Sequence, residues 1–153
     1  MAYSTLVDAD AYFLNRLHVS SWTTASDADK VKGLAEASSR IDRLKFKGDK
    51  VDVDQVLEFP RYYGDESDGT ETIPDDIKNA SYEIALALLD GVDLEIEAAN
   101  LAVTNQAFAS VRTSYDREDV PPYLANGIPS AYAWQYLKPF LVAPGGIKFY
   151  RVS

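Results

Sequence analysis

The sequence predicts a mainly α-helical protein: a bundle of three to five helices with a small β element and an extended C-terminal tail. Two long segments, within residues 26–44 and 74–90, carry apolar side chains at helical spacing. The segments between and after them are rich in Pro, Gly and acidic residues, which favour loops. A chain of 153 residues with 46% hydrophobic residues can form one domain with its own core. We expect a helical domain at residues 1–143 and a hinge with a docking tail at residues 144–153.

The first expected helix covers residues 9–17, with Asp8 as its N-cap. His18 follows its last turn, where a cation is favoured, so a capping or surface role is expected for this residue. The polar stretch 20–24 should break the helix. Trp22 is then expected to pack between this helix and the next one.

A second helix is expected to begin at Ser26 or Asp27 and to end near residue 44, before Gly48. Apolar and small residues repeat along it at intervals of three and four, and this spacing predicts one buried stripe. The residues of the stripe are Val31, Leu34, Ala35, Ser38, Ile41 and Leu44.

Residues 49–71 predict an irregular segment. Pro60 disfavours a helical conformation for Phe59, so we expect Phe59-Pro60-Arg61 to form a rigid turn against the bundle. Residues 64–71 are polar and acidic and are expected to form a mobile loop.

A third helix is predicted from Pro74 to residue 90, because Pro and acidic residues favour the first turn, and Gly91 should stop it. It is apolar on two faces, which is typical of a central core helix or of a helix at a subunit contact. One face carries Ile77, Ala80, Ser81, Ile84, Ala85 and Leu88, and the other carries Tyr82, Leu86 and Leu89. A short helix is expected over residues 93–101.

Beyond residue 101 the pattern changes. Residues 108–115 alternate weakly and favour a strand, and residues 116–127 predict a loop. A last helix is expected over residues 128–138. Three of its aromatic residues are candidates for contacts made on assembly: Tyr132, Trp134 and Tyr136.

The Pro-Gly-Gly sequence at residues 144–146 predicts a hinge. Residues 147–153 combine apolar and basic side chains, and two destinations remain open for them: this chain's own bundle, or a partner. We expect binding to a partner, with Phe149 and Tyr150 as anchors and Arg151 as a charge contact.

The composition argues against several functional classes. The chain has no cysteine, which excludes disulfides and thiolate chemistry. It has one histidine, which excludes a metal site built on several histidines. The acids of residues 52–54 and 65–71 lack the spacing of a metal site. No nucleophile is paired with a base, so we expect no catalytic, cofactor-binding or metal residues, no cofactor and no enzymatic activity. No apolar run approaches the roughly 18 residues of a membrane span, and the N-terminus does not resemble a signal peptide, so we expect a cytoplasmic protein or an assembly built in the cytoplasm.

The net charge of −9 is concentrated in the middle of the chain. Residues 51–100 carry a net charge of −12, whereas the segments before and after them carry +1 and +2. Either these acids belong to solvated loops and helix ends, or they form a surface that faces a polyanion without binding it. The ten tyrosines could stack on bases, but basic residues are not interleaved with them, so core and interface packing is favoured.

Several landmarks occur in an order that is best defined over residues 3–91 and looser beyond. They are Ala9-Asp10-Ala11-Tyr12-Phe13, Trp22, the stretch 32–42, Phe46-Lys47-Gly48, the stretch 55–61, the stretch 73–80 and the stretch 83–89. This order resembles the head–tail connector (adaptor, or head-completion) proteins of tailed bacteriophages. Relatives of that family are also labelled DnaT-like single-stranded-DNA-binding proteins.

The resemblance implies a structural virion protein at the head–tail interface, assembled in the host cytoplasm during head completion and genome packaging. It implies a homo-oligomer, a dodecameric ring beneath the portal protein. The next tail or stopper protein would be a further partner, and DNA would pass through the channel without specific binding. We expect the ring to form only on the portal, and the free chain to be a monomer or small oligomer.

The alternative is a DnaT-like single-stranded-DNA-binding replication protein. Charge favours the adaptor, because a strand-binding groove needs a basic track with stacking aromatics. A channel in which DNA slides benefits instead from weak repulsion. From the acidic middle third we expect negligible affinity for DNA at physiological salt.

Overall fold

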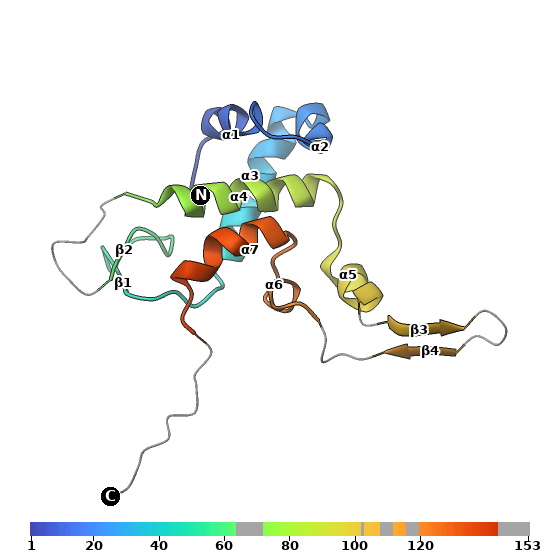
Figure 1. Cartoon of the computed structure of the whole chain (residues 1–153). Helices are drawn as coiled ribbons and strands as arrows, with labels where there is room; N and C mark the ends of the chain where they lie inside the picture. Colours follow the sequence, from blue (N-terminus) through green and yellow to red (C-terminus); the bar gives the residue numbers. More distant parts are fainter. Residues whose placement is uncertain (64–71, 102, 108–111, 116–119, 144–153) are drawn as a thin grey trace, which may run out of the picture.

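The computed structural model describes residues 1–63, 72–101, 103–107, 112–115 and 120–143 (Figure 1). The helices are α1 (Leu6–Phe13), α2 (Ser20–Thr24), α3 (Asp27–Ile41), α4 (Asp75–Leu89), α5 (Leu94–Leu101), α6 (Pro122–Ala125) and α7 (Ala131–Leu137), followed by the 3₁₀ turn η1 (Lys138–Phe140). The strands are β1 (Asp49–Lys50), β2 (Arg61–Tyr62), β3 (Val103–Ala107) and β4 (Arg112–Tyr115), paired antiparallel as β1–β2 and β3–β4. The protein is therefore mainly helical with small β elements, as the sequence predicts.

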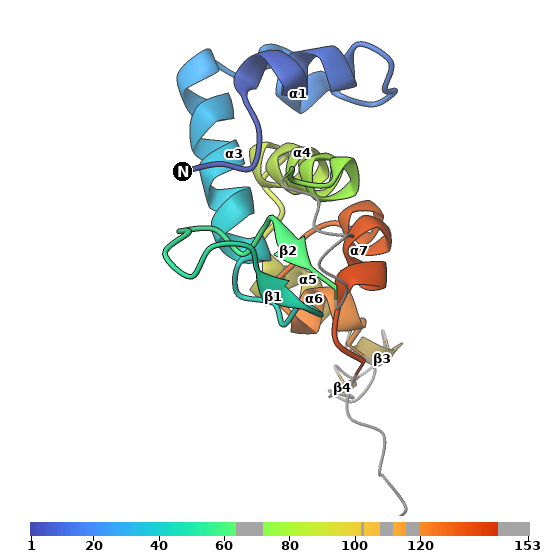
Figure 2. The same ribbon diagram turned by 90° about the vertical axis from the view of Figure 1, so that its left-hand side faces the viewer.

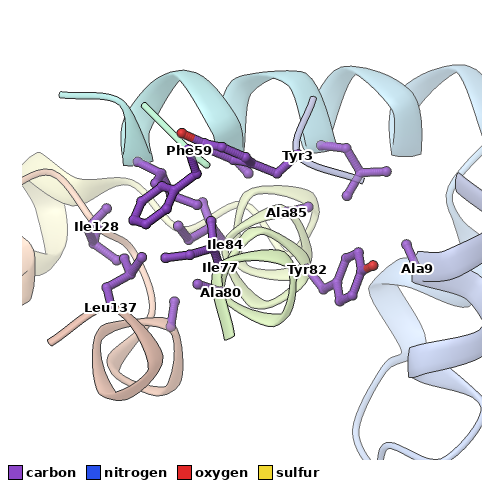
Figure 3. Packing of buried hydrophobic residues seen from close by; sticks show 14 of the residues in the cluster. Tyr3, Ala9, Phe59, Ile77, Ala80, Tyr82, Ile84, Ala85, Ile128 and Leu137 are labelled. Carbon is purple, nitrogen blue, oxygen red and sulfur yellow. The ribbon is translucent and has the colours of Figure 1, made fainter. Parts of the chain in front are cut away.

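The centre of the fold is α4, which packs between α3 and α7 (Figures 1 and 3). Ile77 and Ile84 face Leu137 and Ile128, whereas Tyr82 points to the other side, toward Ala9 of α1 (Figure 3). Small residues of α3 let the helices approach closely: a Cβ added at Gly33 would lie 3.5 Å from the Cβ of Ala85. The predicted central helix is confirmed, with one correction. Leu88 is only half-buried, because it lies near the end of α4 beside an open depression.

The start of the chain differs from the sequence prediction. Helix α1 begins at Leu6 with Thr5 as its N-cap, and Asp8 lies in the first turn, where its backbone N–H donates to the Thr5 hydroxyl. The helix ends at Phe13. His18 lies beyond this end with a positive φ of 60° and is exposed, so of the two roles expected for it the surface role is confirmed and the helix-capping role is not.

The polar stretch 20–24 forms the short helix α2 rather than a break. Trp22 is buried in it, its ring centroid lies 4.6 Å from that of Phe13, and its indole N–H donates to Asp10 at 2.8 Å. The ammonium of Lys30, on α3, lies 5.3 Å from the centre of the indole. These contacts confirm that Trp22 packs between the flanking helices.

Helix α3 is capped by Ser26 as predicted but ends at Ile41 rather than near residue 44. Leu34, Ser38 and Ile41 of the predicted stripe are buried, whereas Val31 is exposed. Val31 lies in the N-terminal half of α3 and is 52% exposed, so the buried stripe begins after it.

The second half of the chain largely follows the prediction. Helix α5 is observed where a short helix was expected, and the strand expected within 108–115 is β4, paired with β3. The expected loop at 116–127 contains α6, and the last helix is α7, capped by Ser130. The loop 64–71, the hinge 144–146 and the tail 147–153 lie outside the described residues.

A buried ion pair joins the end of α1 to α4. The Glu83 carboxylate is 4% exposed and accepts from the Arg16 guanidinium and the Tyr12 hydroxyl, both at 2.8 Å. Burial and the bond to Glu83 raise the pKa of Tyr12, and the bond to Glu83 raises the pKa of Arg16. Arg16 therefore stays charged and the tyrosine stays neutral across ordinary pH.

Candidate nucleic-acid interface

After α3, the chain forms a short extended contact with the segment that follows α7. Phe46 and Leu141 form an antiparallel β-bridge. The Lys47 N–H donates to the Phe140 carbonyl at 2.9 Å, and the Val142 N–H donates to the Lys45 carbonyl at 3.0 Å. Side chains alternate along extended backbone. Because Phe46 is buried, Lys45 and Lys47 are both on the outer side, and both are exposed.

Aromatic rings gather around Phe46 and the segment that pairs with it. The Phe46 ring packs against Phe59 with centroids 4.7 Å apart, and Phe59 packs against Phe140 at 5.7 Å. Tyr63 is the outermost ring of the group: its centroid lies 6.3 Å from that of Phe140, and the residue is 41% exposed. Partial burial raises the pKa of the Tyr63 phenol, which therefore stays neutral at physiological pH.

Lys138 adds a third exposed cation on the same chain segment. Among the described residues, none of the ion pairs involves Lys45, Lys47 or Lys138. The Lys47 ammonium donates only to the backbone carbonyl of Pro139, at 3.1 Å. We call Lys45, Lys47, Lys138, Tyr63 and Phe140 the basic surface. Cations beside an accessible ring are the features with which proteins bind phosphates and stacked bases of a single strand.

Arg61 holds the backbone of this surface in place. Its guanidinium donates to the carbonyls of Lys47 and Gly48 and to the carboxylate of Glu58, and the residue is buried. Gly48 has a φ of 71°, and a Cβ at this position would lie 1.9 Å from the Tyr62 carbonyl oxygen, so only glycine fits. The predicted rigid turn at Phe59-Pro60-Arg61 is confirmed, and Arg61 serves structure rather than a ligand.

The acidic middle third does not form one face among the described residues. Apart from the buried Glu83, its described acids fall in three groups: Asp52, Asp54 and Glu58 in the β1–β2 region, Asp75 and Asp76 at the start of α4, and Asp90, Asp93, Glu95 and Glu97 beyond its end. A helix of 15 residues is about 22 Å long, so the last two groups are well separated. In the first group, Glu58 is paired with Lys50 at 3.0 Å and with Arg61, which also donates to the Lys47 carbonyl.

The site residues predicted from the sequence lie elsewhere. Tyr132 on α7 is exposed and lies under the Arg16 guanidinium, 4.6 Å from its ring centre. Trp134 and Tyr136 are half-buried against the core. Phe149, Tyr150 and Arg151 lie outside the described residues. The described chain leads toward them through Val142, which is hydrogen-bonded to Lys45.

Sequence reasoning did not find the basic surface. A signal is present, because the cations Arg43, Lys45 and Lys47 alternate around Phe46, and a period of two indicates extended chain with its cations on one side. Tyr63 and Lys138 join them only through tertiary contacts, and no sequence pattern shows these.

Other kinds of site receive no support from the described part of the chain. Within it, no group of three or more His, Asp or Glu side chains is arranged to hold a metal ion. None of the described helices is both long and apolar enough to cross a membrane.

The fold and the basic surface define a small helical protein whose exposed chemistry suits a polyanionic strand. A family model described as "Putative DnaT-like ssDNA binding protein" matches residues 2–152, and the chain belongs to this family. Comparison with curated proteins and with solved structures gives no match. Of the two family labels that the sequence suggested, the match supports the DnaT-like one and gives no support to the head–tail connector family.

Proposed function

We propose that this protein acts by binding single-stranded DNA through the basic surface, without catalysis. One observation carries the proposal: Lys45 and Lys47 lie together on the outer side of the Phe46–Leu141 bridge, and the exposed ring of Tyr63 packs against Phe140, whose carbonyl accepts from the Lys47 N–H. The family to which the chain belongs is described by the same activity.

The geometry suggests how a strand would be bound. Alternate residues of extended chain are about 7 Å apart, so Lys45 and Lys47 can contact different phosphates of one strand. Tyr63 can stack on a base, a contact worth about 1–3 kcal/mol that every base can make. With only about three phosphates neutralised, the affinity should be modest and should fall with salt with a log–log slope of about −2.

The proposal differs from the negligible affinity expected from the charge of residues 51–100. Six of the 14 acids of that segment lie at the ends of α4 or beyond its C-terminal end, and charges more than about 8–10 Å apart in solution are largely screened at physiological salt. A single titration decides between the two expectations.

The test is fluorescence anisotropy of a labelled oligothymidine and of a duplex of equal length, at low and physiological salt. We expect saturable binding that favours the single strand, and about tenfold weaker binding by Lys45→Ala/Lys47→Ala. Tyr63→Ala should weaken binding by a similar factor, because a stacking contact is lost. Lys32→Ala is the matched control, since Lys32 is an exposed α3 lysine already paired with Asp29. Absence of binding at low salt, or an equal loss in the control, would refute the proposal.

A second candidate is the adaptor ring under a phage portal, with the portal and the next tail or stopper protein as partners in the virion. The observation that favours it is an exposed apolar face on α1, formed by Val7, Ala11 and Leu14, since such faces mark subunit contacts. Negative-stain imaging with and without portal-bearing capsids tests it. A ring that forms on the portal supports the adaptor, whereas a chain that never joins the capsids rules it out.

A further inference from the structure

Helix α1 carries an apolar face that the rest of the described chain leaves uncovered. Val7, Ala11 and Leu14 are spaced by four and three residues and therefore lie on one face, opposite the buried Ala9 and Phe13. Val7 is 76% exposed and Leu14 is 85% exposed. Large apolar side chains this exposed at helical spacing indicate a surface that a partner covers.

An acidic groove lies next to this face, between α1 and α4. It has a volume of about 370 Å³ and is lined by Asp8, Tyr12, Asp75, Lys78, Asn79 and Tyr82. Lys78 is its one cation and pairs with Asp75 at 3.2 Å. Hydrogen bonds from the Thr5 and Ser4 hydroxyls lower the pKa of Asp8, which is therefore ionised at neutral pH. Asp8 and Tyr12 lie on α1 between the groove and the apolar face, so the two form one continuous surface.

We propose that this surface of one copy binds residues 147–152 of a second copy. The segment is Ile-Lys-Phe-Tyr-Arg-Val, which has four apolar or aromatic residues, two cations and no acid. Its composition is complementary to an apolar face with an acidic border. Phe149 covers Val7 and Leu14, and the Arg151 guanidinium enters the groove toward Asp8 and Asp75, beside the rings of Tyr12 and Tyr82.

The described chain that leads to residues 147–152 ends at Ala143, far from the α1 surface of the same chain. This position favours binding to the α1 surface of a second copy. Residues 140–142 pair with residues 45–47, beyond the C-terminal end of α3, whereas Asp10 of α1 pairs with Lys30 near its N-terminal end. Figures 1 and 2 show α1 at the top of the molecule, with the chain leaving α7 on the far side of α4. Fully extended, the six residues that follow Ala143 and end at Phe149 span at most about 20–22 Å. The 15 residues of α3 alone cover about 22 Å, and a path from the end of α7 to α1 must also pass around α4.

The contact is head-to-tail, so it adds copies in sequence and closes only if the rotation between copies allows a ring. Six residues on a two-turn helix bury less than the roughly 1,200 Å² of a stable interface. Association of the free chain is therefore weak and rises with concentration.

Cysteine cross-linking tests the proposal directly, because the chain has no cysteine of its own. Full-length Leu14→Cys and Phe149→Cys are purified separately, mixed and oxidised mildly. We expect the disulfide-linked heterodimer to form at least tenfold faster than in a mixture of Val53→Cys with Phe149→Cys. Val53 is the matched control, since it is 89% exposed and lies in the β1–β2 region.

Three results would overturn the proposal. The first is a heterodimer yield equal to the control. The second is faster linkage of Leu14→Cys to itself, which would mean that α1 pairs with α1. The third is dilution-independent linkage within a single Leu14→Cys/Phe149→Cys chain, which would assign the surface to the chain's own segment.

A charge exchange provides a further readout. Arg151→Glu introduced together with Phe149→Cys should abolish the cross-link, and Asp75→Arg in the Leu14→Cys partner should restore it. The outcome is separable from DNA binding, because Lys45→Ala/Lys47→Ala should leave cross-linking unchanged. If the protein does not bind DNA but the cross-link forms, the proposed function is wrong and the proposed contact between copies is still supported.

Discussion

Glu83 shows how a charge is accommodated inside this small core. Its carboxylate is almost fully buried on α4, and Arg16 and Tyr12 donate to it from the α1 region. A buried charge is tolerated only while it is paired. The contacts among the three residues therefore stabilise the packing of α1 against α4.

Removing the cation from this pair should be costly. Arg16→Ala is expected to lower the free energy of unfolding by about 3 kcal/mol, the low end for a buried pair, because Arg16 itself is 28% exposed. Urea unfolding followed by circular dichroism measures this. Lys32→Ala breaks an exposed pair and should cost no more than about 1 kcal/mol. Equal losses in the two variants would contradict the assignment of Arg16–Glu83 as a buried pair that stabilises the fold.

Asp10 makes the stability of the folded protein depend on pH in the acid range. Its carboxylate accepts from the Trp22 indole and from Lys30, and these bonds lower its pKa in the folded state. The stabilisation is fully present above the unfolded pKa of about 3.9 and is lost as the pH falls through the lower folded value. Asp8 and Asp29 shift in the same direction, through bonds from Thr5 and Ser26.

The expected result is a melting temperature that is constant near neutral pH and falls below about pH 4. Asp10→Asn should melt lower at pH 7 and lose less on acidification, as measured by thermal scans at pH 7 and pH 3. A variant with the same pH dependence as the parent would show that Asp10 does not contribute.

Among the elements, α4 organises the bundle, and its two ends differ. Ile84 is fully buried between α3 and α7, whereas Leu88 is half-buried beside an open depression of about 620 Å³. The sequence predicts the same role for both residues. The structure separates them, because the last turn of α4 is open to solvent on one side.

This difference gives a paired prediction. Ile84→Asp places an unpaired charge in the core at a cost of several kcal/mol, comparable to the whole stability of a small domain, so soluble folded protein should not form. Leu88→Asp should fold, with a lower melting temperature, because water reaches the new carboxylate. Soluble yield and circular dichroism distinguish the two. Normal folding of Ile84→Asp would contradict the core assignment.

Sequence patterns predicted the elements whose stability comes from a repeating apolar face. Helices α3 and α4 follow from their periodicity, and Ser26 and Ser130 cap where capping rules place them. Elements that tertiary contacts stabilise were missed or displaced: α2 forms because Trp22 is buried, and α1 is shifted toward the N-terminus by the Thr5 cap.

The candidate site also depends on tertiary contacts that local sequence patterns do not show. The alternation of Lys45 and Lys47 is visible in the sequence, but its meaning depends on Phe46 pairing with Leu141, ninety-five residues away. Under the proposed function, the net charge is a poor guide to binding, because it sums charges over the whole surface, whereas a strand responds to those within about 10 Å.

At the scale of the whole molecule, the surface proposed to bind DNA and the surface proposed to bind a second copy are different faces. The basic surface lies where the segments after α3 and α7 pair, and the apolar and acidic surface of α1 lies at the other end of α3. A copy bound to DNA therefore keeps its α1 surface free for a neighbour. Adding oligothymidine should raise the rate of the Leu14→Cys to Phe149→Cys cross-link, because copies on one strand are held at high local concentration. An unchanged rate would mean that copies do not lie side by side on DNA.

The most direct test of the central claim is to locate the bound strand. An oligonucleotide substituted with bromodeoxyuridine is irradiated with the full-length protein, and the linked peptides are identified by mass spectrometry. If the strand binds to the basic surface, we expect the main linkage at Tyr63 or within residues 138–143. This linkage should disappear at high salt and in Lys45→Ala/Lys47→Ala. Linkage at α1 or on the exposed face of α7, or the same yield in the double variant, would contradict it.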